Sequence, residues 1–240
     1  MRILIVNDDG ISAPGIRKLV QIAVLFGEVW VVAPKEQCSA MSHRITVNGE
    51  IQVVKEGFEV KDVKAAYSVK GTPADCVKIA LKYLLPERPD IVFSGINNGY
   101  NAGLDISYSG TVGAAMEALL NKIPAIAFSS ELEGDYKITD QYLFQVISEL
   151  LKEPIAKNEI WNVNIPCGEI KECKGVLKER IPAQEQFYAD NYEKTDLTIN
   201  SFALTACGIP AEDAKDGTDM RAVLDGYISI GKIRNTILKG

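Results

Sequence analysis

The sequence has a single histidine, His43, among its 240 residues. A zinc site built from imidazoles, or a Ser-His-Asp triad, would depend entirely on that residue, so both kinds of site are disfavoured. Five cysteines are present, but no two of them form a CxxC pair. We therefore expect free thiols rather than a metal-binding or disulfide framework.

Long apolar runs are also missing. No stretch approaches the roughly 18 consecutive apolar residues of a membrane-spanning helix, and no basic segment followed by an apolar stretch and a cleavage site opens the chain. We therefore expect a cytoplasmic protein that makes no membrane contact. The net charge of −6 argues against a surface for polymeric nucleic acid, although a single nucleotide could still bind in a metal-neutralised pocket.

A short apolar run near the start of the chain ends in two adjacent carboxylates. Ile3–Val6 are followed by Asn7, Asp8, Asp9 and Gly10. An uncharged run that stops at a turn signal predicts a strand buried on both faces, and ligands bind at the carboxyl ends of such strands. Adjacent carboxylates repel each other unless a cation neutralises them, and Mg²⁺ or Mn²⁺ prefers oxygen ligands. Taken alone, the stretch also fits ordinary turn chemistry, with one Asp capping the next helix.

Strands and helices alternate through the first two thirds of the chain, which predicts a Rossmann-like, three-layer α/β core with a mostly parallel sheet. Strands are predicted at 3–6, 29–33, 66–69, 91–96, 124–129 and 161–166, and helices at 15–26, 72–85, 111–119 and 139–151. A hairpin is predicted from 45–47 and 51–53. After 166 the helical periodicity ends, and short alternating segments appear, such as 176–180, 197–199 and 227–230. We expect one domain, with an α/β core over 1–166 and a β-rich extension over 167–240 that makes oligomer contacts.

Two loops leave the same sheet edge as the two carboxylates. The loop after the second strand carries Ser39 and His43. The loop after the strand at 91–96 carries Asn97 and is long and dense in Gly, Asn and Ser, which is typical of functional loops. Ser39 and Asn97 are oxygen donors that suit a hard cation.

The long loop ends at Ser109-Gly110-Thr111, where a helix of small residues begins. The free N–H groups and the positive dipole end of a helix N-terminus form a natural phosphate site. The alternative is that Ser109 or Thr111 is only an N-cap. A metal site beside such a helix start is the arrangement for metal-assisted phosphoester hydrolysis.

Five motifs occur in order along the chain. They are Asn7-Asp8-Asp9-Gly10, Ala33-Pro34 with Ser39, Gly71-Thr72-Pro73-Ala74-Asp75, Ser94-Gly95-Ile96-Asn97, and Tyr108-Ser109-Gly110-Thr111-Val112. Together they resemble the SurE (survival protein E) family of 5′/3′-nucleotidases, over about residues 1–166. The resemblance implies an acid-phosphatase-like 5′-nucleotidase that depends on a divalent metal and acts on nucleoside monophosphates, often also on short polyphosphate. It also implies a homodimer or homotetramer built partly by exchanging C-terminal segments.

The resemblance also implies residue roles. One divalent ion per subunit, Mg²⁺ or Mn²⁺, would be held by Asp8, Asp9, Ser39 and Asn97. Phosphate contacts fall on Asn101 and on Ser109, Gly110 and Thr111. Independently of the resemblance, we expect the metal to lower the pKa of an attacking water, with Asp8 and Asp9 as the catalytic carboxylates. One of the two takes the proton of this water, and we expect it to be Asp9. His43 is a candidate acid for the leaving ribose oxygen if its loop folds over the site, and a structural histidine is the alternative.

The chain departs from the family pattern at a few positions. Ala40 follows Ser39 where the family usually has Gly, and Cys38 replaces a common Arg. Late in the chain, Ser229-Ile230-Gly231-Lys232 stands where family members often end a strand with Thr-Pro-Leu. The four predicted metal ligands are unaffected by these differences.

Three other classes of protein fit the Asp-Asp strand less well. A receiver-type phospho-acceptor module, which is a non-enzyme that holds Mg²⁺ with such a pair, needs a third Asp after its central strand, but strands here end in Ala33-Pro34, Ser94-Gly95 and Ser129-Ser130. A phosphatase that forms a phospho-aspartate typically places its two Asp residues one apart, and here they are adjacent. A dinucleotide-binding oxidoreductase needs a GxGxxG after the first strand, and Asp8-Asp9-Gly10 occupies that turn.

Overall fold

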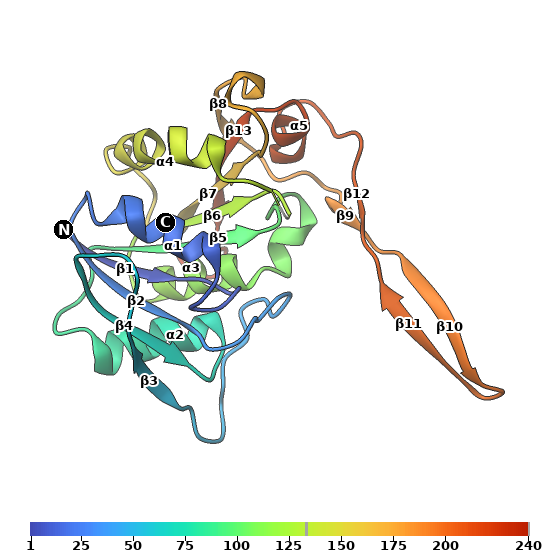
Figure 1. Cartoon of the computed structure of the whole chain (residues 1–240). Coiled ribbons are helices and arrows are strands. Elements are labelled where there is room, and N and C mark those ends of the chain that lie inside the picture. The colour runs from blue at the N-terminus through green and yellow to red at the C-terminus, as the bar shows by residue number, and fades with distance from the viewer. Residues whose placement is uncertain (133, 240) are drawn as a thin grey trace.

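The computed structural model describes residues 1–132 and 134–239. Within these residues a nine-stranded, mostly parallel sheet has the order β3-β4-β2-β1-β5-β6-β7-β13-β8 (Figure 1). The strands are β1 (Arg2–Val6), β2 (Glu28–Pro34), β3 (Val53–Glu56), β4 (Val63–Val69), β5 (Ile91–Asn98), β6 (Ala125–Ser130), β7 (Glu159–Ile165), β8 (Val176–Arg180) and β13 (Ile228–Arg234). In this sheet β3 is antiparallel to β4 and β13 to β7, and the other pairs are parallel.

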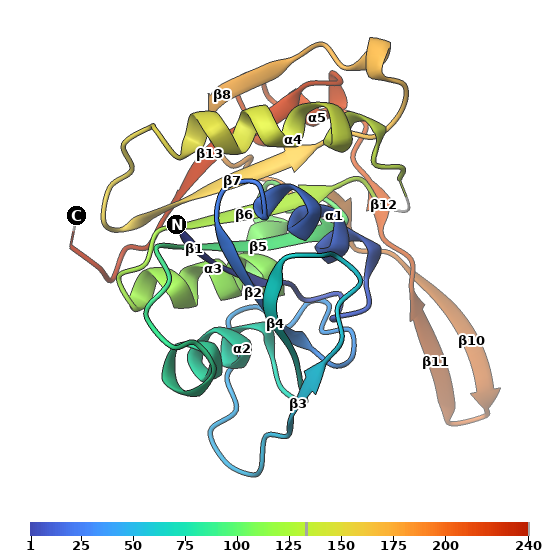
Figure 2. The ribbon, with the colours of Figure 1, turned by 60° about the vertical axis from the view of Figure 1, so that its left-hand side comes forward.

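Helices cover both faces of the sheet, which confirms the predicted three-layer architecture (Figure 2). One face carries α1 (Pro14–Ala23) and α4 (Lys137–Leu150), and the other carries α2 (Pro73–Ile79) and α3 (Gly110–Leu120). A π-helical turn (Ala80–Leu84) continues α2, and 3₁₀ turns lie at Leu104–Ser107 and Ile170–Glu172. Along β1, Ile3 and Ile5 belong to the core beneath α1 and α4, whereas Leu4 and Val6 belong to the core beneath α2 and α3. This two-sided burial explains why the run carries no charge.

The order of the strands creates a switch point beside β1. From β1 the chain moves outward in one direction to β2 and β4, and it then returns to place β5 on the other side of β1. Both neighbours of β1 run parallel to it. In open α/β sheets, ligands bind outside the carboxyl ends of the strands at such a point. Here that position lies just after Val6 and at the end of β5.

The predicted hairpin at 45–47 and 51–53 was wrong. Residues 44–47 form no strand, and β3 pairs instead with β4. The backbone groups that a hairpin would use are taken by the start of α2: the N–H of Thr46 donates to Asp75 Oδ1 at 2.9 Å, and the carbonyl of Arg44 accepts from Thr72 Oγ1 at 2.6 Å. The helix α5 (Asp219–Leu224) was also missed, because six residues are too short to show helical periodicity.

The β-rich extension contributes both to the sheet and to a projecting hairpin. Its strands β8 and β13 join the main sheet, and β9 (Tyr188–Ala189) pairs with β12 (Ile209–Pro210). Between them, β10 (Tyr192–Thr198) and β11 (Ser201–Ala206) form an antiparallel hairpin that extends away from the body (Figures 1 and 2). The extension is therefore anchored at both ends, and its middle projects as the β10–β11 hairpin.

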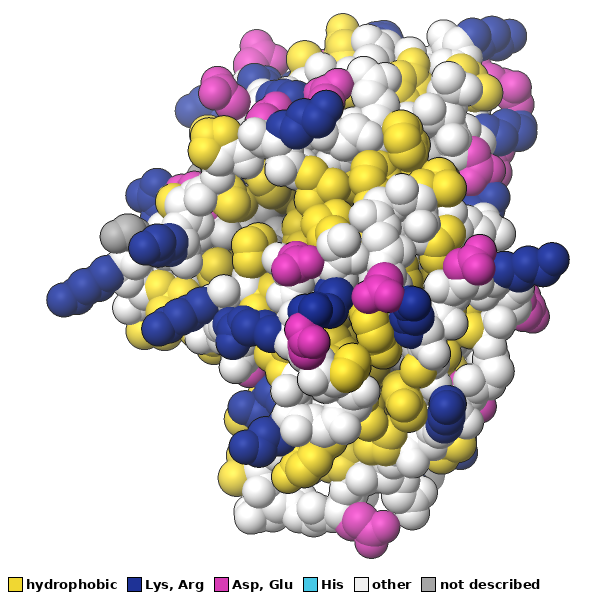
Figure 3. Space-filling model, turned by 90° about the vertical axis from the view of Figure 1, so that its left-hand side faces the viewer, with side chains coloured by type: hydrophobic (Ala, Val, Ile, Leu, Met, Phe, Trp, Pro, Cys, Tyr) yellow, Lys and Arg dark blue, Asp and Glu magenta, His cyan; other side chains and the backbone are white. Residues whose placement is uncertain are grey.

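The state of the cysteines and the mixture of charged side chains on the surface are as expected from the composition. All five cysteines are free thiols. On the face shown in Figure 3, basic and acidic side chains are interspersed, with apolar side chains visible between them. Among the described residues, no helix has both the length and the apolar character needed to cross a membrane.

Candidate active site

Asp8 lies two residues beyond β1, on the side of the sheet that faces α3. Its side chain is 4% exposed. The hydroxyl of Thr111 donates to Asp8 Oδ1 at 2.6 Å, and the N–H of Thr111 donates to Asp8 Oδ2 at 3.1 Å. The carboxylate therefore lies against the N-terminus of α3, where the helix dipole favours negative charge.

Asp9 points to a different partner. Its Oδ2 accepts the N–H of Asn98, at the end of β5, at 2.9 Å. Burial, the largest effect, raises the pKa of Asp8 to about 6, while the hydrogen bonds from Thr111 oppose this rise and the charge of Asp9 adds to it. Burial also raises the pKa of Asp9. Among the described residues neither carboxylate forms an ion pair with Lys or Arg, so the two negative charges are not neutralised by the protein.

A cavity of about 340 Å³ opens at the switch point. The predicted site residues in its lining are Asp8, Ser39, Asn97, Asn101 and Ser109. They come from the ends of β1 and β5, from the loop after β2, from the long loop and from the start of α3. The structure therefore brings five of the nine predicted residues to one cavity, which we call the active-site cavity, and the other four, Asp9, His43, Gly110 and Thr111, are not part of its lining.

The loop that carries Ser39, residues 35–50, is tied to α2. Asp75 lies in the first turn of α2 and accepts both the N–H and the hydroxyl of Thr46, at 2.9 and 2.7 Å. Asp75 also accepts the N–H of Thr72, whose hydroxyl accepts the N–H of Asp75 to complete a capping box. The motif Gly71-Thr72-Pro73-Ala74-Asp75 thus fixes the far end of the Ser39 loop.

The same loop is tied to α3 and the turn before it. The N–H and hydroxyl of Ser42 donate to the carbonyls of Tyr108 and Ser107, both at 2.8 Å. His43 Nε2 lies 2.9 Å from Oε2 of Glu117, a buried residue of α3. The structure therefore turns the imidazole of His43 toward α3, and His43 is not part of the active-site cavity lining.

Asn101 is held by a buried polar cluster on the last strands of the parallel sheet. Its N–H donates to Asn164 Oδ1 at 2.9 Å, and its carbonyl accepts from Asn162 Nδ2 and Asn164 Nδ2 at 2.8 and 3.0 Å. Its side-chain Nδ2 donates to Ser129 Oγ at 2.7 Å. These bonds fix both the backbone and the amide of Asn101 at the cavity wall.

The residues at the start of α3 have two roles: Ser109 caps the helix, and Thr111 binds the carboxylate of Asp8. Ser109 is the N-cap, and its Oγ accepts the N–H of Val112 at 3.0 Å, which leaves the hydroxyl proton available to a ligand. Thr111 lies behind Asp8 and donates to it. Neither Gly110 nor Thr111 is part of the cavity lining. Of the predicted helix-start contacts, only Ser109 faces the cavity directly.

The donor set suits a hard divalent cation. Within the described ranges, no group of three or more His, Cys, Asp or Glu residues comes together that could hold a metal. The predicted ligands are instead two carboxylates, a hydroxyl and an amide, which are all oxygen donors. The amide nitrogen of Asn97 is used by the carbonyl of Gly99 at 2.7 Å, so its oxygen remains for a ligand. The uncompensated charge of Asp8 and Asp9 fits a cation at this position.

Comparisons with known proteins agree with these features. The sequence model of the family described as Survival protein SurE matches residues 3–186. The chain belongs to the SurE family. A protein named 5′-nucleotidase SurE from Clostridium botulinum is 39% identical over 236 residues, covering 96% of this chain and 91% of the relative. A protein with the same name from Pelobacter propionicus is 38% identical over 233 residues, covering 96% and 92%. The crystal structure of SurE protein from Aquifex aeolicus superposes with a TM-score of 0.82 at 34% identity, covering 98% of this chain and 93% of that one.

Ala40, the residue after Ser39, has an unfavourable backbone conformation. Ala40 has a φ of +54°, in the left-handed region that favours glycine. The resemblance drawn from the sequence implies Gly at this position, and here an alanine takes a backbone conformation of the kind that favours glycine. Ser42 also has a positive φ, of +51°. The Ser39 loop is therefore held in a strained conformation by its bonds to α2 and α3.

Several residues of the active-site cavity were not predicted from the sequence. They are Ala40, Asn98, Gly99, Tyr100, Asp105, Tyr108, Leu132, Tyr188 and Gly208. Most of these lie beside motifs of the SurE family. Their position in the sequence next to Asn97 or Ser109 could have been used to predict that they line the cavity. Tyr188 and Gly208 come from the β-rich extension, and no local pattern points to them.

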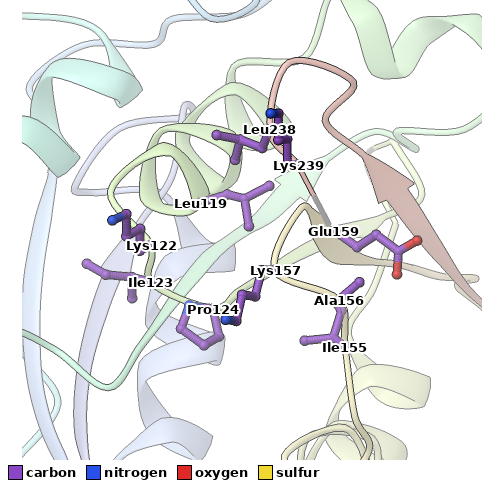
Figure 4. Close-up of a pocket in the computed structure, with 10 residues that line it drawn as sticks. All are labelled: Leu119, Lys122, Ile123, Pro124, Ile155, Ala156, Lys157, Glu159, Leu238 and Lys239. Atoms are coloured by element: carbon purple, nitrogen blue, oxygen red, sulfur yellow. The ribbon is translucent and has the colours of Figure 1, made fainter.

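A second cavity lies at the opposite edge of the sheet (Figure 4). Its volume is about 410 Å³, and it lies beside Pro124 and Glu159, at the amino ends of β6 and β7. The carboxylate of Glu159 points away from the apolar side chains and accepts from Arg234 at 2.8 and 3.1 Å. No residue predicted for SurE chemistry lines this cavity, so we assign the chemistry to the switch point.

Gly110 allows the close approach of Asp8 to α3, and we expect it to be sensitive to substitution. A Cβ at Gly110 would lie 3.0 Å from both Cβ and Oδ2 of Asp8 and 3.2 Å from Cγ of Pro73. In Gly110→Ala the carboxylate must therefore shift by a few tenths of an ångström. We expect the rate of phosphate release to fall at least about tenfold and the free energy of unfolding by about 1–3 kcal/mol.

The matched control for this variant is Gly57→Ala. A Cβ at Gly57 would meet no heavy atom within 4 Å. Phosphate release and urea unfolding should be measured for both variants. Wild-type activity in Gly110→Ala would show that the packing of Asp8 against α3 does not matter for the reaction.

Proposed function

We propose that the protein is a divalent-metal-dependent nucleotidase that hydrolyses nucleoside 5′-monophosphates to nucleoside and phosphate. The observation that carries this proposal is the buried, uncompensated Asp8 carboxylate beside Asp9 at the switch point of a SurE fold. The names of the relatives support a 5′-nucleotidase, that is, a hydrolase of phosphomonoesters. Nucleoside 3′-monophosphates and short polyphosphate are further substrates in this proposal.

We propose that Asp8, Asp9, Ser39 and Asn97 hold one Mg²⁺ or Mn²⁺ ion per subunit. Such an ion supplies Lewis-acid polarisation of the phosphoryl group and lowers the pKa of water. Ser39 already accepts a hydrogen bond from Gln37 Nε2 at 2.9 Å, which orients its hydroxyl. All four residues leave oxygen lone pairs for a cation.

The chain's own residues divide the remaining tasks. Both oxygens of Asp8 are engaged by Thr111, whereas in the described part of the chain Asp9 Oδ2 accepts the N–H of Asn98. We therefore assign to Asp9 the acceptance of a proton from the attacking water. The Ser109 hydroxyl and the Asn101 amide lie where they can donate to phosphate oxygens, and the dipole of α3 adds to this stabilisation. Gly110 and Thr111 contribute to the phosphate site by positioning Asp8.

We propose a structural role for His43. Its contact with Glu117 fastens the Ser39 loop to α3, and this geometry does not direct the imidazole toward a leaving ribose oxygen. The alternative of a receiver-type signalling module is disfavoured, because relatives with 38–39% identity over nearly the whole chain carry the name 5′-nucleotidase SurE.

The experiment that tests the proposed function is an assay of phosphate release. Nucleoside 5′- and 3′-monophosphates and tripolyphosphate are supplied with Mg²⁺ or Mn²⁺, and parallel reactions contain EDTA. We expect release from 5′-AMP that depends on the added metal. No release from any nucleoside monophosphate with either metal would contradict the proposal, and the Asp8 variant described in the Discussion identifies the site.

We also propose that the chain forms a homodimer or homotetramer through the β10–β11 hairpin. An isolated two-stranded hairpin is marginally stable in water, and large exposed apolar side chains mark contact surfaces. Register places Tyr192, Phe202 and Leu204 on one face of this hairpin. They are 54%, 56% and 54% exposed. A second copy of the chain is the partner that covers this face.

Lys194 and Asp196 lie on the same face and pair with each other, so an unpaired carboxylate at position 202, directly opposite Asp196, is expected to dissociate the oligomer. We expect Phe202→Asp to lower the molar mass in solution from two or four times the chain mass of 26.2 kDa toward a smaller species. The control is Thr195→Asp, which places the same charge on the opposite face, across from Ala203. Sedimentation velocity measures both. A monomeric wild type, or an unchanged mass in Phe202→Asp, would exclude the hairpin as the contact.

A further inference from the structure

The active-site cavity is also lined by residues to which we assign no metal or phosphate role. Four of them are aromatic or apolar, and they are Tyr100, Tyr108, Leu132 and Tyr188. The side chains of Tyr108 and Leu132 are 55% and 53% exposed. A cavity with both polar and aromatic lining residues fits a phosphate ester with a flat organic group better than it fits bare phosphate.

Gly99 lies beside both kinds of lining residue. A Cβ at this position would lie 3.7 Å from the hydroxyl of Tyr188, 3.8 Å from Nδ2 of Asn97 and 4.0 Å from Cδ1 of Leu132. The space above Gly99 is therefore bordered by a predicted metal ligand and by Tyr188 and Leu132. The φ of Gly99 is +123°, so glycine is also required by the backbone. The missing side chain leaves this space to a ligand that contacts both kinds of residue.

Tyr188 belongs to the β-rich extension, yet its position in the cavity is fixed. The carboxylate of Asp105 accepts the N–H groups of Phe187 and Tyr188 at 3.0 and 2.9 Å. The Tyr188 hydroxyl accepts the N–H of Tyr100 at 3.3 Å. The residue also pairs with Pro210 of β12. Hydrogen bonds thus fix Tyr188 both at its backbone and at its side-chain hydroxyl.

The segment that leads to Tyr188 is fastened along the long loop. The N–H of Leu104 donates to the carbonyl of Glu185 at 2.9 Å. The buried carboxylate of Asp219 accepts the N–H groups of Gly103 and Ala183 at 3.0 and 2.9 Å. The extension is therefore built into the wall of the active site before it leaves toward the hairpin.

We propose that Tyr188 is the wall against which the nucleoside part of the substrate packs, with the base on the tyrosine ring and the phosphate at Asp8. The proposal rests on the proposed function and assigns a residue of the extension to substrate recognition. Aromatic rings stack on any base, so this contact binds nucleosides without strong preference among them. Leu132 borders the same space above Gly99, and Tyr108 is part of the cavity lining.

The test compares substrates with and without a base. In Tyr188→Ala we expect the KM for 5′-AMP to rise about tenfold or more, because stacking on the ring is lost. With ribose 5-phosphate, which has no base, KM and kcat should stay within about threefold of wild type. Tyr188→Phe keeps the ring and should retain the wild-type KM for 5′-AMP. Tyr83→Ala, which removes a 78% exposed tyrosine far from the cavity, is the matched control.

An unchanged KM for 5′-AMP in Tyr188→Ala, or an equal rise with ribose 5-phosphate, would overturn the proposal. If Tyr188→Ala does not fold, Tyr188→Leu replaces it, since leucine fills the space without an aromatic ring. A wild type that hydrolyses neither ester would contradict the proposed function alone. Binding of adenosine, measured by calorimetry, then decides: binding weakened about tenfold in the variant supports the nucleoside wall, and equal binding overturns it.

Discussion

Replacing Asp8 with Asn is expected to lower phosphate release from 5′-AMP by about 1000-fold or more, equivalent to about 4 kcal/mol in the barrier. The substitution keeps the size of the side chain and removes the charge that the proposed cation requires. Folding should be largely retained, because asparagine still offers an acceptor to the Thr111 hydroxyl, and a neutral amide avoids the cost of a buried carboxylate. The measurements are metal-dependent phosphate release and thermal unfolding of the metal-free protein.

The control for this variant is Asp140→Asn. Asp140 lies on α4, and its partly exposed carboxylate pairs with Lys18 at 2.7 Å. Exposed pairs of this kind contribute little to stability, so activity should stay within about twofold of wild type. Activity near wild type in Asp8→Asn would remove Asp8 from the proposed chemistry.

The second large effect concerns metal and pH together. In the unfolded chain Asp8 has its ordinary pKa of 3.8, and in the folded protein burial raises the pKa to about 6. Because the folded pKa is the higher one, the metal-free protein loses free energy of unfolding as the pH rises from about 4 through about 6. A divalent cation binds the charged form and competes with the proton. Added Mg²⁺ or Mn²⁺ should therefore stabilise the protein mainly above pH 6.

At pH 7.5 and a metal concentration about 100 times Kd, we expect a gain of about 2.7 kcal/mol and a rise in Tm of about 5–10 °C. At pH 5 the rise should be less than about half as large, because Asp8 is mostly protonated. Differential scanning calorimetry with sodium chloride of equal ionic strength as the control measures the difference. An equal rise at both pH values, or the full rise in Asp8→Asn, would contradict cation binding at this carboxylate.

The parts of the site that follow parallel strands could be predicted from the sequence. Asp8, Ser39 and Asn97 each follow an apolar run, and the carboxyl ends of parallel strands meet at one edge, so local pattern was enough to bring them together. The order of the strands could not be read in the same way. Nevertheless, the placement of the first strand beside the switch point follows from its two-sided burial.

Other features depended on contacts between distant parts of the chain. Tyr188 enters the cavity because Asp105, 83 residues earlier, binds its backbone, and no periodicity reports such a contact. The sequence predicted a phosphate site at the helix start at 109–111, but it could not show that the carboxylate of Asp8 takes the Thr111 donors. The prediction of a hairpin from 45–47 and 51–53 was wrong for a similar reason, since Thr46 forms a hydrogen bond with Asp75 on a separate helix.

The loop that carries Ser39 has a consequence for the affinity of the site. Two of its residues, Ala40 and Ser42, hold backbone conformations that a free peptide rarely visits, and bonds to α2 and α3 keep them there. The entropy of ordering this loop is lost when the chain folds, not when the cation arrives. The proposed cation would therefore bind without loop closure, to a set of oxygens that is already in place.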